Sequence, residues 1–244
     1  MIPKKIHYCW FGRGEMPAIA KKCIESWSKI LPDYEIIRWD ETNFDINATP
    51  FTKRAYEDKK YAFVSDYVRL YALAEFGGIY MDVDEIILKD FTSIIDGKEL
   101  VACFETEKSV MVGFLATIPK YKIIQDFLEI YDKWNINVEN VEYIANPKIF
   151  TKLLEKYGLE LNGTMQSLDE GKIVIYPNEY FCGYDFSVNK EKITNNTYGI
   201  QKYAGTWTSA AERWNKKMRE LLVNVIGEKN YLKLKVVVRK VKKK

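Results

Sequence analysis

The sequence predicts an α/β protein, because strand-like and helix-like runs alternate from its first residues onward. KIHYCW at 5–10 predicts a short strand, and residues 18–31 have the apolar spacing of a helix. Pro32 stops that helix, and YEIIRW at 34–39 predicts a second strand. A strand, a helix and a second strand in this order are typical of one half of a nucleotide-binding α/β domain.

A longer helix then leads to a pair of acidic residues. Pro50–Lys60 predicts a short exposed helix, and Ala62–Phe76 predicts a helix with a broad apolar face. The pair Gly77-Gly78 ends the longer helix, because glycine accepts the left-handed backbone of a C-terminal cap. A short apolar strand at 79–81 follows, and it runs directly into the triplet DVD.

The remaining elements fit one domain, since strands and helices stay mixed and no clean boundary separates them. We expect a Rossmann-like mixed sheet flanked by helices over residues 1–227, ending in a C-terminal helix, and then a basic amphipathic tail at 228–244. Further strands are predicted at 85–88, 100–105, 110–117, 173–176 and 198–203, and further helices at 121–134, 147–157 and 207–226.

The composition excludes several kinds of site. Cys9, Cys23, Cys103 and Cys182 are scattered and His7 is the only histidine, so neither a zinc-ligand cluster nor histidine-based catalysis is expected. We expect isolated buried thiols instead. No run approaches the 18 apolar residues of a membrane span, and the N-terminus lacks a signal peptide, so we expect a cytoplasmic protein.

The charge of the chain is divided between its body and its tail. Lys233–Lys244 holds seven Lys or Arg and no acidic residue, whereas the rest of the chain has 30 basic and 34 acidic residues. The body is therefore not a nucleic-acid-binding surface by charge. The tail could be a solvated end, a nucleic-acid arm or a membrane anchor, and its interleaved leucine and valine favour an anionic membrane surface.

Asp82 and Asp84 are the strongest chemical signal. Magnesium and manganese prefer carboxylate oxygens, completed by phosphate and water. Acidic triplets are also common in loops, so position decides the interpretation. These two residues follow a helix, a glycine pair and a strand, and open α/β sheets bind ligands at the carboxyl ends of their strands. The pattern favours a site for a metal and a diphosphate.

Two further features fit the same site. Asp66 and Arg69 lie three positions apart and share a helix face. They form either a surface ion pair or, if their apolar neighbours bury them, a pair that orients a ligand. Trp10 follows the first predicted strand, where an indole can stack on a nucleobase or belong to the core.

Taken together, five segments resemble the DXD-containing glycosyltransferases of family 32. This family includes bacterial capsule and lipopolysaccharide enzymes and yeast-type mannosyltransferases, and the same core is similar to the catalytic domain of the large clostridial glucosylating toxins. The resemblance implies a GT-A fold, a nucleotide-sugar donor, Mn²⁺ or Mg²⁺, and transfer with retention. The segments, spread over residues 2–207, are IPKKIHYCWFG, LPDYEIIRWDETNFD, SDYVRLYALAEFGGIYMDVD, IYPNEYF and AGTW.

The resemblance also implies residues that bind the nucleotide. Trp10 would stack on the base, Ser65 would lie near the nucleoside, and Tyr80 would pack beside the ribose and the phosphates. Thr206 and Trp207 match a late Ser-Trp pair of the family, which closes over the diphosphate.

The sugar and the metal would be held by four acidic or basic residues. Asp66 and Arg69 would bind the donor sugar, while Asp82 would contact the ribose, the sugar or a metal-bound water. The expected catalytic residues are thus Asp66, Arg69 and Asp82, and the expected metal-binding residues are Asp82 and Asp84. Glu105 is a possible carboxylate on the acceptor side. No residue matches a covalent nucleophile, so attack on the same face as the departing diphosphate is expected.

One departure from the family concerns the metal. Many relatives carry two histidines before the late Ser-Trp pair, and here Gln201 and Lys202 replace them. An oxygen of Gln201 or Thr206, a water, or the charge of Lys202 could take over. The sequence therefore leaves the third protein ligand open.

The biological expectation rests on the resemblance as well. We expect a hexose or N-acetylhexosamine carried by UDP, with GDP as the alternative carrier. The expected acceptor is a glycan, lipid-linked, in bacterial surface polysaccharide synthesis at the inner face of the membrane. Two alternatives are a sugar-nucleotide-binding protein with impaired catalysis, and a magnesium-dependent phosphohydrolase that uses Asp82 and Asp84.

Overall fold

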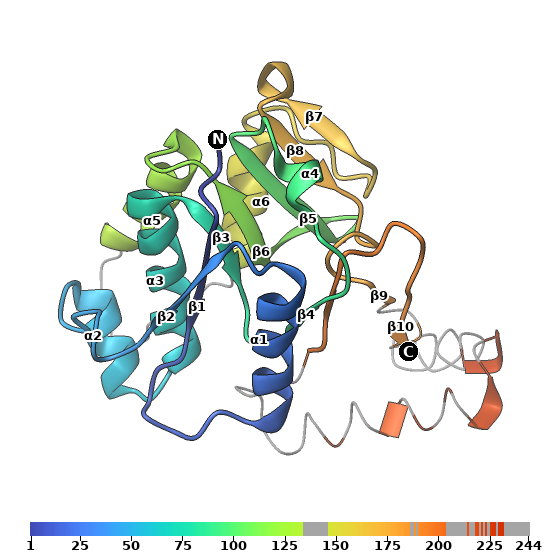
Figure 1. The fold of residues 1–244 in the computed structure, drawn as a ribbon, viewed down its shortest axis with the longest axis horizontal. Helices are drawn as coiled ribbons and strands as arrows, with labels where there is room; N and C mark the ends of the chain where they lie inside the picture. The colour runs from blue at the N-terminus through green and yellow to red at the C-terminus, as the bar shows by residue number, and fades with distance from the viewer. Residues whose placement is uncertain are drawn as a thin grey trace, which may run out of the picture.

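The computed structural model describes residues 1–133, 146–185, 188 and 190–203, and nearer the C-terminus 214, 218–219, 221, 223, 225–227 and 229–231. Over these residues a seven-stranded sheet with the order β2-β1-β3-β6-β5-β8-β7 forms the centre of the molecule, and helices lie on both of its faces (Figure 1). The predicted α/β class and its mixed sheet are confirmed. The predicted division at residue 227 stays a prediction.

The N-terminal half supplies the parallel part of the sheet. β1 pairs in parallel with both β2 and β3, so the carboxyl ends of these three strands lie at one edge. The elements are β1 (Lys5–Cys9), α1 (Ala18–Ile30), β2 (Glu35–Trp39), α2 (Pro50–Glu57), α3 (Tyr61–Phe76), β3 (Gly78–Met81), β4 (Glu85–Ile87) and α4 (Thr92–Ile95).

The C-terminal half joins the sheet mainly in antiparallel fashion. β6 pairs antiparallel with β3 on one side and with β5 on the other, while β8 runs parallel to β5. Its elements are β5 (Leu100–Thr106), β6 (Ser109–Thr117), α5 (Lys122–Asp132), α6 (Asn146–Glu155), β7 (Gln166–Leu168), a 3₁₀ turn (Asp169–Gly171), β8 (Ile173–Tyr176), β9 (Tyr184–Asp185), β10 (Lys190–Glu191) and β11 (Gly199–Gln201).

Two hydrophobic layers cover the faces of the sheet. One layer lies between the sheet and α3, α5 and α6, and the other lies between the sheet and α1 (Figure 1). Helix α3 is apolar around most of its circumference and buries Val64, Val68, Leu70 and Leu73 completely. Each such side chain contributes about 1.5–3 kcal/mol to folding. α3 is therefore a fixed support for the polar residues that it carries.

α2 was expected to be exposed, but its inner face buries Phe51, Thr52 and Ala55, since its eight residues pack against α3. The predicted helix at 207–226 lies partly outside the described residues, and its described members are helical. Lys233–Lys244 also lies outside them.

The turn between α3 and β3 requires both of its glycines. Gly77 and Gly78 have φ angles of 62° and 99°, which side chains rarely adopt. A Cβ on Gly78 would also lie 2.6 Å from the carbonyl oxygen of Lys5 on β1. The buried His7 accepts a hydrogen bond from Trp39 through Nδ1 (3.2 Å) and bonds the carbonyl oxygen of Gly77 through Nε2 (2.9 Å). The turn is thereby held tightly against β1.

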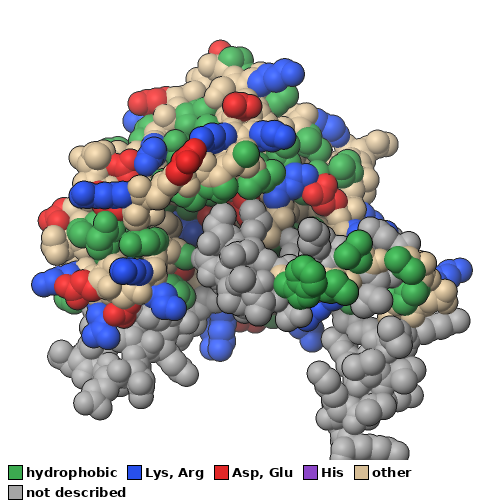
Figure 2. All heavy atoms as spheres, turned by 90° about the horizontal axis from the view of Figure 1, so that it is seen from below, with side chains coloured by type: hydrophobic (Ala, Val, Ile, Leu, Met, Phe, Trp, Pro, Cys, Tyr) green, Lys and Arg blue, Asp and Glu red, His purple; other side chains and the backbone are tan. Residues whose placement is uncertain are grey.

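The surface is mixed in charge. On the face drawn in Figure 2, basic and acidic side chains are interspersed and hydrophobic side chains are exposed between them. The four cysteines are buried and unpaired, as predicted. Among the described helices, none combines the length and the apolar character needed to cross a bilayer.

Candidate active site

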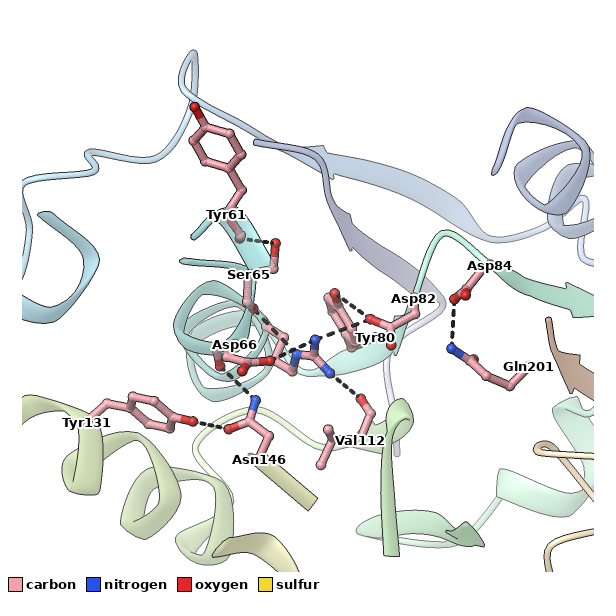
Figure 3. A network of polar contacts seen from close by, with 11 residues as sticks. Tyr61, Ser65, Asp66, Tyr80, Asp82, Asp84, Val112, Tyr131, Asn146 and Gln201 are labelled. Atoms are coloured by element: carbon pink, nitrogen blue, oxygen red, sulfur yellow. Dashed lines mark hydrogen bonds and ion pairs between the residues drawn. The ribbon is translucent and has the colours of Figure 1, made fainter. Parts of the chain in front are cut away.

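The candidate site is built where β3 ends beside β6. Asp82 is the first residue after β3, and its backbone N–H donates to the carbonyl oxygen of Gly113 on β6 at 2.8 Å. α3 runs alongside, so Asp66 lies on the same side as Asp82 (Figure 3), and Arg69 forms ion pairs with both. Three residues that the sequence predicts as catalytic are therefore brought together.

Arg69 is the centre of the network, and only 6% of its surface is exposed. Its Nη2 lies 3.1 Å from Asp66 Oδ1 and 3.3 Å from Asp82 Oδ1, and its Nη1 donates to the carbonyl oxygen of Val112 at 2.9 Å. The guanidinium also lies 4.5 Å from the centre of the Tyr80 ring. The interpretation of Asp66 and Arg69 as an exposed surface pair is wrong, because apolar neighbours bury them.

Both hydrogen-bond partners described for the Asp82 carboxylate bind the same oxygen, Oδ1. Its Oδ1 accepts a hydrogen bond from the Tyr80 hydroxyl at 3.0 Å and also pairs with Arg69. Tyr80 is itself 2% exposed, so its ring is covered; the ring contacts Arg69 and its hydroxyl group contacts Asp82. The second carboxylate oxygen of Asp82 faces Gly113, at the opposite side of the group.

Burial changes the proton affinity of this cluster. Burial and, to a smaller extent, the negative charge of Asp82 raise the pKa of Asp66 to about 6, even though Arg69 acts to lower it. The pKa of Tyr80 is raised well above its usual range by burial, so its hydroxyl keeps its proton and donates to Asp82. Such perturbed groups gathered at a strand end are typical of functional sites.

Asp84 is held by a different part of the chain. Gln201 Nε2 donates to Asp84 Oδ1 at 2.7 Å, and the backbone N–H of Lys202 donates to the carbonyl oxygen of Asp84 at 2.8 Å. This contact exists because β11 pairs antiparallel with β4, with Gln201 opposite Glu85. The residues that replace the family's histidines thus lie at the acidic triplet. Lys202 Nζ is bound to Glu191 Oε1 at 2.8 Å.

Glu85 directly follows Asp84, and its side chain lies in the protein interior. It is completely buried, and neither of its carboxylate oxygens has a hydrogen-bond partner among the described residues. Burial, together with Asp84 and Asp82, raises its pKa well above the usual range. Trp27 Nε1 donates to the Glu85 carbonyl oxygen at 2.7 Å and fixes this segment to α1.

The oxygens present fit a hard divalent cation. Asp82 and Asp84 supply carboxylates, and Gln201 Oε1 is buried without a hydrogen-bond partner among the residues that the structure describes. Within those residues, no group of three His, Cys, Asp or Glu side chains is placed to hold a metal. Among the described residues, a protein ligand beyond the two carboxylates is therefore of another type.

The predicted base-stacking residue lies near the start of α3. Trp10 follows β1 and is partly exposed, and its Nε1 donates to the carbonyl oxygen of Gly14 at 2.7 Å. Gly12, within the same loop, packs so closely on Tyr61 that a Cβ would lie 2.4 Å from the ring. Ser65 donates to the Tyr61 carbonyl oxygen at 3.1 Å, so Trp10 and Ser65 belong to neighbouring segments. Thr206 and Trp207 lie outside the described residues.

Glu105 lies at the end of β5. Its Oε1 accepts a hydrogen bond from the Tyr203 hydroxyl at 3.1 Å, and burial raises its pKa above the usual range. Asp82 is close enough to raise that pKa further. Its place near the candidate site is compatible with the predicted acceptor side.

Two residues that support the site, Asn146 and Gly113, were not predicted from the sequence as site residues. Asn146 is 1% exposed; its Oδ1 accepts from the Tyr131 hydroxyl and its Nδ2 donates to the carbonyl oxygen of Asp66 at 3.4 Å. A buried asparagine that opens a helix has no signal in the sequence beyond that of a possible cap. Gly113 did have a signal, since glycine inside an apolar strand marks a close approach.

This fold and site resemble those of glycosyltransferases with a DXD-type sugar-binding region. Residues 17–101 match the family model described as "Glycosyltransferase sugar-binding region containing DXD motif". The predicted resemblance is confirmed by this match. It covers α1 to β5 and includes Asp66, Arg69, Asp82 and Asp84.

Individual relatives agree with this class. The chain is 36% identical over 91 residues to inositol phosphoceramide mannosyltransferase 3 of Schizosaccharomyces pombe, which is 34% of this chain and 24% of that protein. It is 25% identical over 265 aligned residues to a toxin of Photorhabdus asymbiotica, covering 86% of this chain and 9% of the toxin. The chain thus spans about a quarter or less of the length of the curated relatives that it matches.

The comparison with solved structures supports the fold. The PaToxG glycosyltransferase superposes with a TM-score of 0.52 at 23% identity, over 64% of this chain and 69% of that chain. The predicted GT-A fold is confirmed by this likeness.

Proposed function

We propose that the chain is a metal-dependent, retaining glycosyltransferase that moves a hexose or N-acetylhexosamine from a UDP-sugar to a glycan acceptor. The observation that carries this proposal is the buried network of Asp66, Arg69 and Asp82 beside Asp84. A network of this kind offers a fixed cation and several carboxylates to the hydroxyl groups and the diphosphate of a sugar nucleotide.

Arg69 and Asp66 orient the donor sugar. The guanidinium is already locked by the carbonyl oxygen of Val112 and by two carboxylates, so little rotamer freedom is lost when a ligand binds. Asn146 supports Asp66 from behind through the carbonyl oxygen of that residue. The catalytic contribution of these groups is positioning.

The nucleotide lies along the ends of β1 and β3 in this proposal. Trp10 stacks on the base, and Ser65 lies near the nucleoside. Tyr80 acts on the ribose and phosphate side through its hydroxyl bond to Asp82. Thr206 and Trp207 close over the diphosphate.

Asp82 and Asp84 hold the divalent cation. When bound, Mg²⁺ or Mn²⁺ would neutralise the charge that develops on the departing nucleoside diphosphate. The acceptor hydroxyl attacks from the side of the leaving group, and the departing phosphate accepts its proton. Glu105 lies on the acceptor side, where its carboxyl group can hydrogen-bond an acceptor hydroxyl and orient it for attack.

The acceptor is a lipid-linked glycan of bacterial surface polysaccharide, and the enzyme is a cytoplasmic protein attached to the inner face of the membrane. Support comes from the C-terminal segment. Trp214, Met218, Leu221 and Val225 recur at helical spacing and are 64%, 40%, 49% and 81% exposed. An exposed apolar row followed by Lys233–Lys244 is typical of a helix at an anionic membrane interface.

The test is donor turnover by the wild type and by Asp84→Ala. A thermal-shift panel of sugar nucleotides with Mn²⁺ identifies the donor, and its turnover is then measured. Asp84→Ala should abolish turnover and keep the fold, whereas Glu25→Ala, which removes an exposed carboxylate on α1, should change neither. Full activity of Asp84→Ala in excess EDTA would exclude the metal role.

A second function is favoured by one observation. Gln201 and Lys202 stand where many relatives have histidines, so the chain could bind a sugar nucleotide with impaired catalysis. Stabilisation by a nucleotide without any turnover in Mn²⁺ is the result expected for that function. Release of inorganic phosphate from simple esters would instead identify a phosphohydrolase.

A further inference from the structure

The side-chain amide of Gln201 is buried, and only its nitrogen has a hydrogen-bond partner among the described residues. The side chain is on β11 and the residue is 7% exposed. Its Nε2 donates to Asp84 Oδ1 at 2.7 Å, whereas its Oε1 has no hydrogen-bond partner among the described residues. The reverse orientation would set the amide oxygen against a carboxylate oxygen, so the bond to Asp84 fixes which end is the acceptor. A buried acceptor without a partner is costly, and a ligand at this position would satisfy it.

Gly113 shows where that oxygen points. A Cβ at Gly113 would lie 2.8 Å from Asp82 Oδ2 and 3.2 Å from Gln201 Oε1. Both oxygens therefore border the same small space above β6. The other oxygen of Asp82 is already used by Tyr80 and Arg69.

This space brings together side-chain oxygens from two distant parts of the chain. Asp82 and Asp84 come from the end of β3, and Gln201 comes from β11 (Figure 3). The absence of a side chain at Gly113 keeps the space open. Lys202 lies beside this segment, and its Nζ forms an ion pair with Glu191 Oε1 at 2.8 Å.

We propose that Gln201 Oε1 is the third protein ligand of the divalent cation held by Asp82 and Asp84, and that Gly113 leaves the room for this cation. The inference rests on the proposed metal-dependent function and goes further by naming the ligand. The resulting shell is built from oxygens alone. Such a shell favours hard cations, Mg²⁺ and Mn²⁺, over Zn²⁺, which prefers nitrogen and sulfur ligands.

The test measures Mn²⁺ affinity directly, by electron paramagnetic resonance of free Mn²⁺, on the full chain with UDP present. Gln201→Met keeps the length of the side chain and removes the oxygen. We expect it to weaken Mn²⁺ binding by roughly tenfold or more, the lower bound for disturbing a metal shell. Gln125→Met makes the same chemical change at an exposed position of α5 and should bind Mn²⁺ as the wild type does.

Two further variants test the site without depending on one substitution. Gly113→Ala leaves Gln201 intact and fills the space, so it should weaken Mn²⁺ binding by a similar factor. Gln201→His should retain Mn²⁺ binding but let Zn²⁺ compete better than in the wild type, because imidazole suits zinc. Thermal unfolding without metal verifies that each variant folds. If Gln201→Met does not fold, the Mn²⁺ affinity of Gly113→Ala decides the outcome.

The outcomes separate this inference from the proposed function. Wild-type Mn²⁺ affinity in folded Gln201→Met, or in Gly113→Ala if only that variant folds, would overturn the role of Gln201. Metal-dependent transfer by the wild type would still stand in that case. An equal loss of metal-free UDP affinity in Gln201→Met would also overturn it, since the amide would then contact the nucleotide. A wild type that binds no Mn²⁺ and transfers fully in EDTA would overturn both proposals.

Discussion

At the scale of single residues, Arg69 is the residue that compensates the buried negative charges of the site. It is the positive partner of both Asp66 and Asp82, and all three lie in or beside the core. Breaking a buried ion pair from one side leaves uncompensated charge, which costs far more than losing an exposed pair.

Arg69→Ala should therefore lower both stability and catalysis. We expect a loss of about 3–5 kcal/mol in the free energy of unfolding, and a fall in kcat of about 10²–10³-fold, the size seen when one charge-stabilising donor is removed. UDP affinity should change much less, because the contact is to the sugar. Denaturant unfolding, turnover and UDP titration measure the three quantities.

Arg54→Ala is the matched control for this change. Arg54 and Asp58 form an exposed pair one helical turn apart on α2, so the loss should stay within about 1 kcal/mol. Unchanged turnover in Arg69→Ala would remove Arg69 from the donor-sugar site.

His7 predicts a pH dependence of stability. Burial lowers the pKa of His7 below its ordinary 6.5, so the folded state holds the neutral ring while the unfolded chain takes up a proton below that pH. Its contribution is thus complete above about pH 6.5 and is lost as the pH falls below it, by up to about 1.4 kcal/mol per pH unit.

His7→Gln keeps a donor and an acceptor for Gly77 and Trp39 but cannot titrate. The difference in unfolding free energy between wild type and variant should shrink steadily from pH 7 to pH 5, measured by denaturant titration at each pH. The comparison between wild type and variant is needed because Asp66 also titrates in this range. The pKa of Asp66 in the folded state is raised to about 6, so its contribution to stability increases as the pH falls, opposite to that of His7. A difference that stays constant with pH would show that His7 does not titrate in the folding equilibrium.

At the scale of elements, α3 and β3 form the unit that presents the site. α3 supplies Asp66 and Arg69, and β3 delivers Asp82 after a turn that only glycines permit. The geometry of that turn sets where β3 meets β1.

Gly78→Ala should destabilise the protein in two ways. The alanine would need a left-handed backbone and would place its Cβ 2.6 Å from the carbonyl oxygen of Lys5. Gly97→Ala shares the positive φ but has nothing within 4 Å of its Cβ, so it should lose only about 1–2 kcal/mol. Chemical denaturation should show a clearly larger loss for Gly78→Ala, and equal losses would mean that β1 yields to the added methyl group.

The sequence predicted these local elements because the information for them is local. Apolar spacing located α3, the glycine pair located its end, and a motif located Asp82 and Asp84. The pairing of β11 with β4 could not be predicted in this way, because three residues of weak pattern meet a strand more than a hundred positions earlier. The support of Asp66 by Asn146, across 80 positions, is non-local in the same sense.

At the scale of the whole molecule, charge is separated along the chain. Residues 213–244 carry twelve basic and two acidic side chains, while the remainder of the chain is acidic on balance. Trp214 and Val225, both exposed, belong to this basic segment. A segment of this composition is attracted to anionic lipid.

Sedimentation with anionic vesicles should depend on this segment. Each basic residue near such a surface contributes about 1 kcal/mol. A chain ending at Gly227 lacks eight basic residues and should therefore bind at least roughly 100-fold more weakly. Trp214→Ser should weaken binding, whereas Ile193→Ser, which removes an exposed apolar side chain of the body, should not. Equal sedimentation of full and shortened chains would remove the membrane proposal.

The pairing of Gln201 with Asp84 has a consequence for synthesis of the chain. The two residues are 117 positions apart, so Asp84 leaves the ribosome long before Gln201 does. At about 5–20 residues per second, roughly 6–23 s pass between them. During that interval Asp84 lacks this partner and β4 lacks β11. A nascent chain arrested before residue 199 should therefore expose the triplet, and competence for the donor should arise only after β11 has been synthesised.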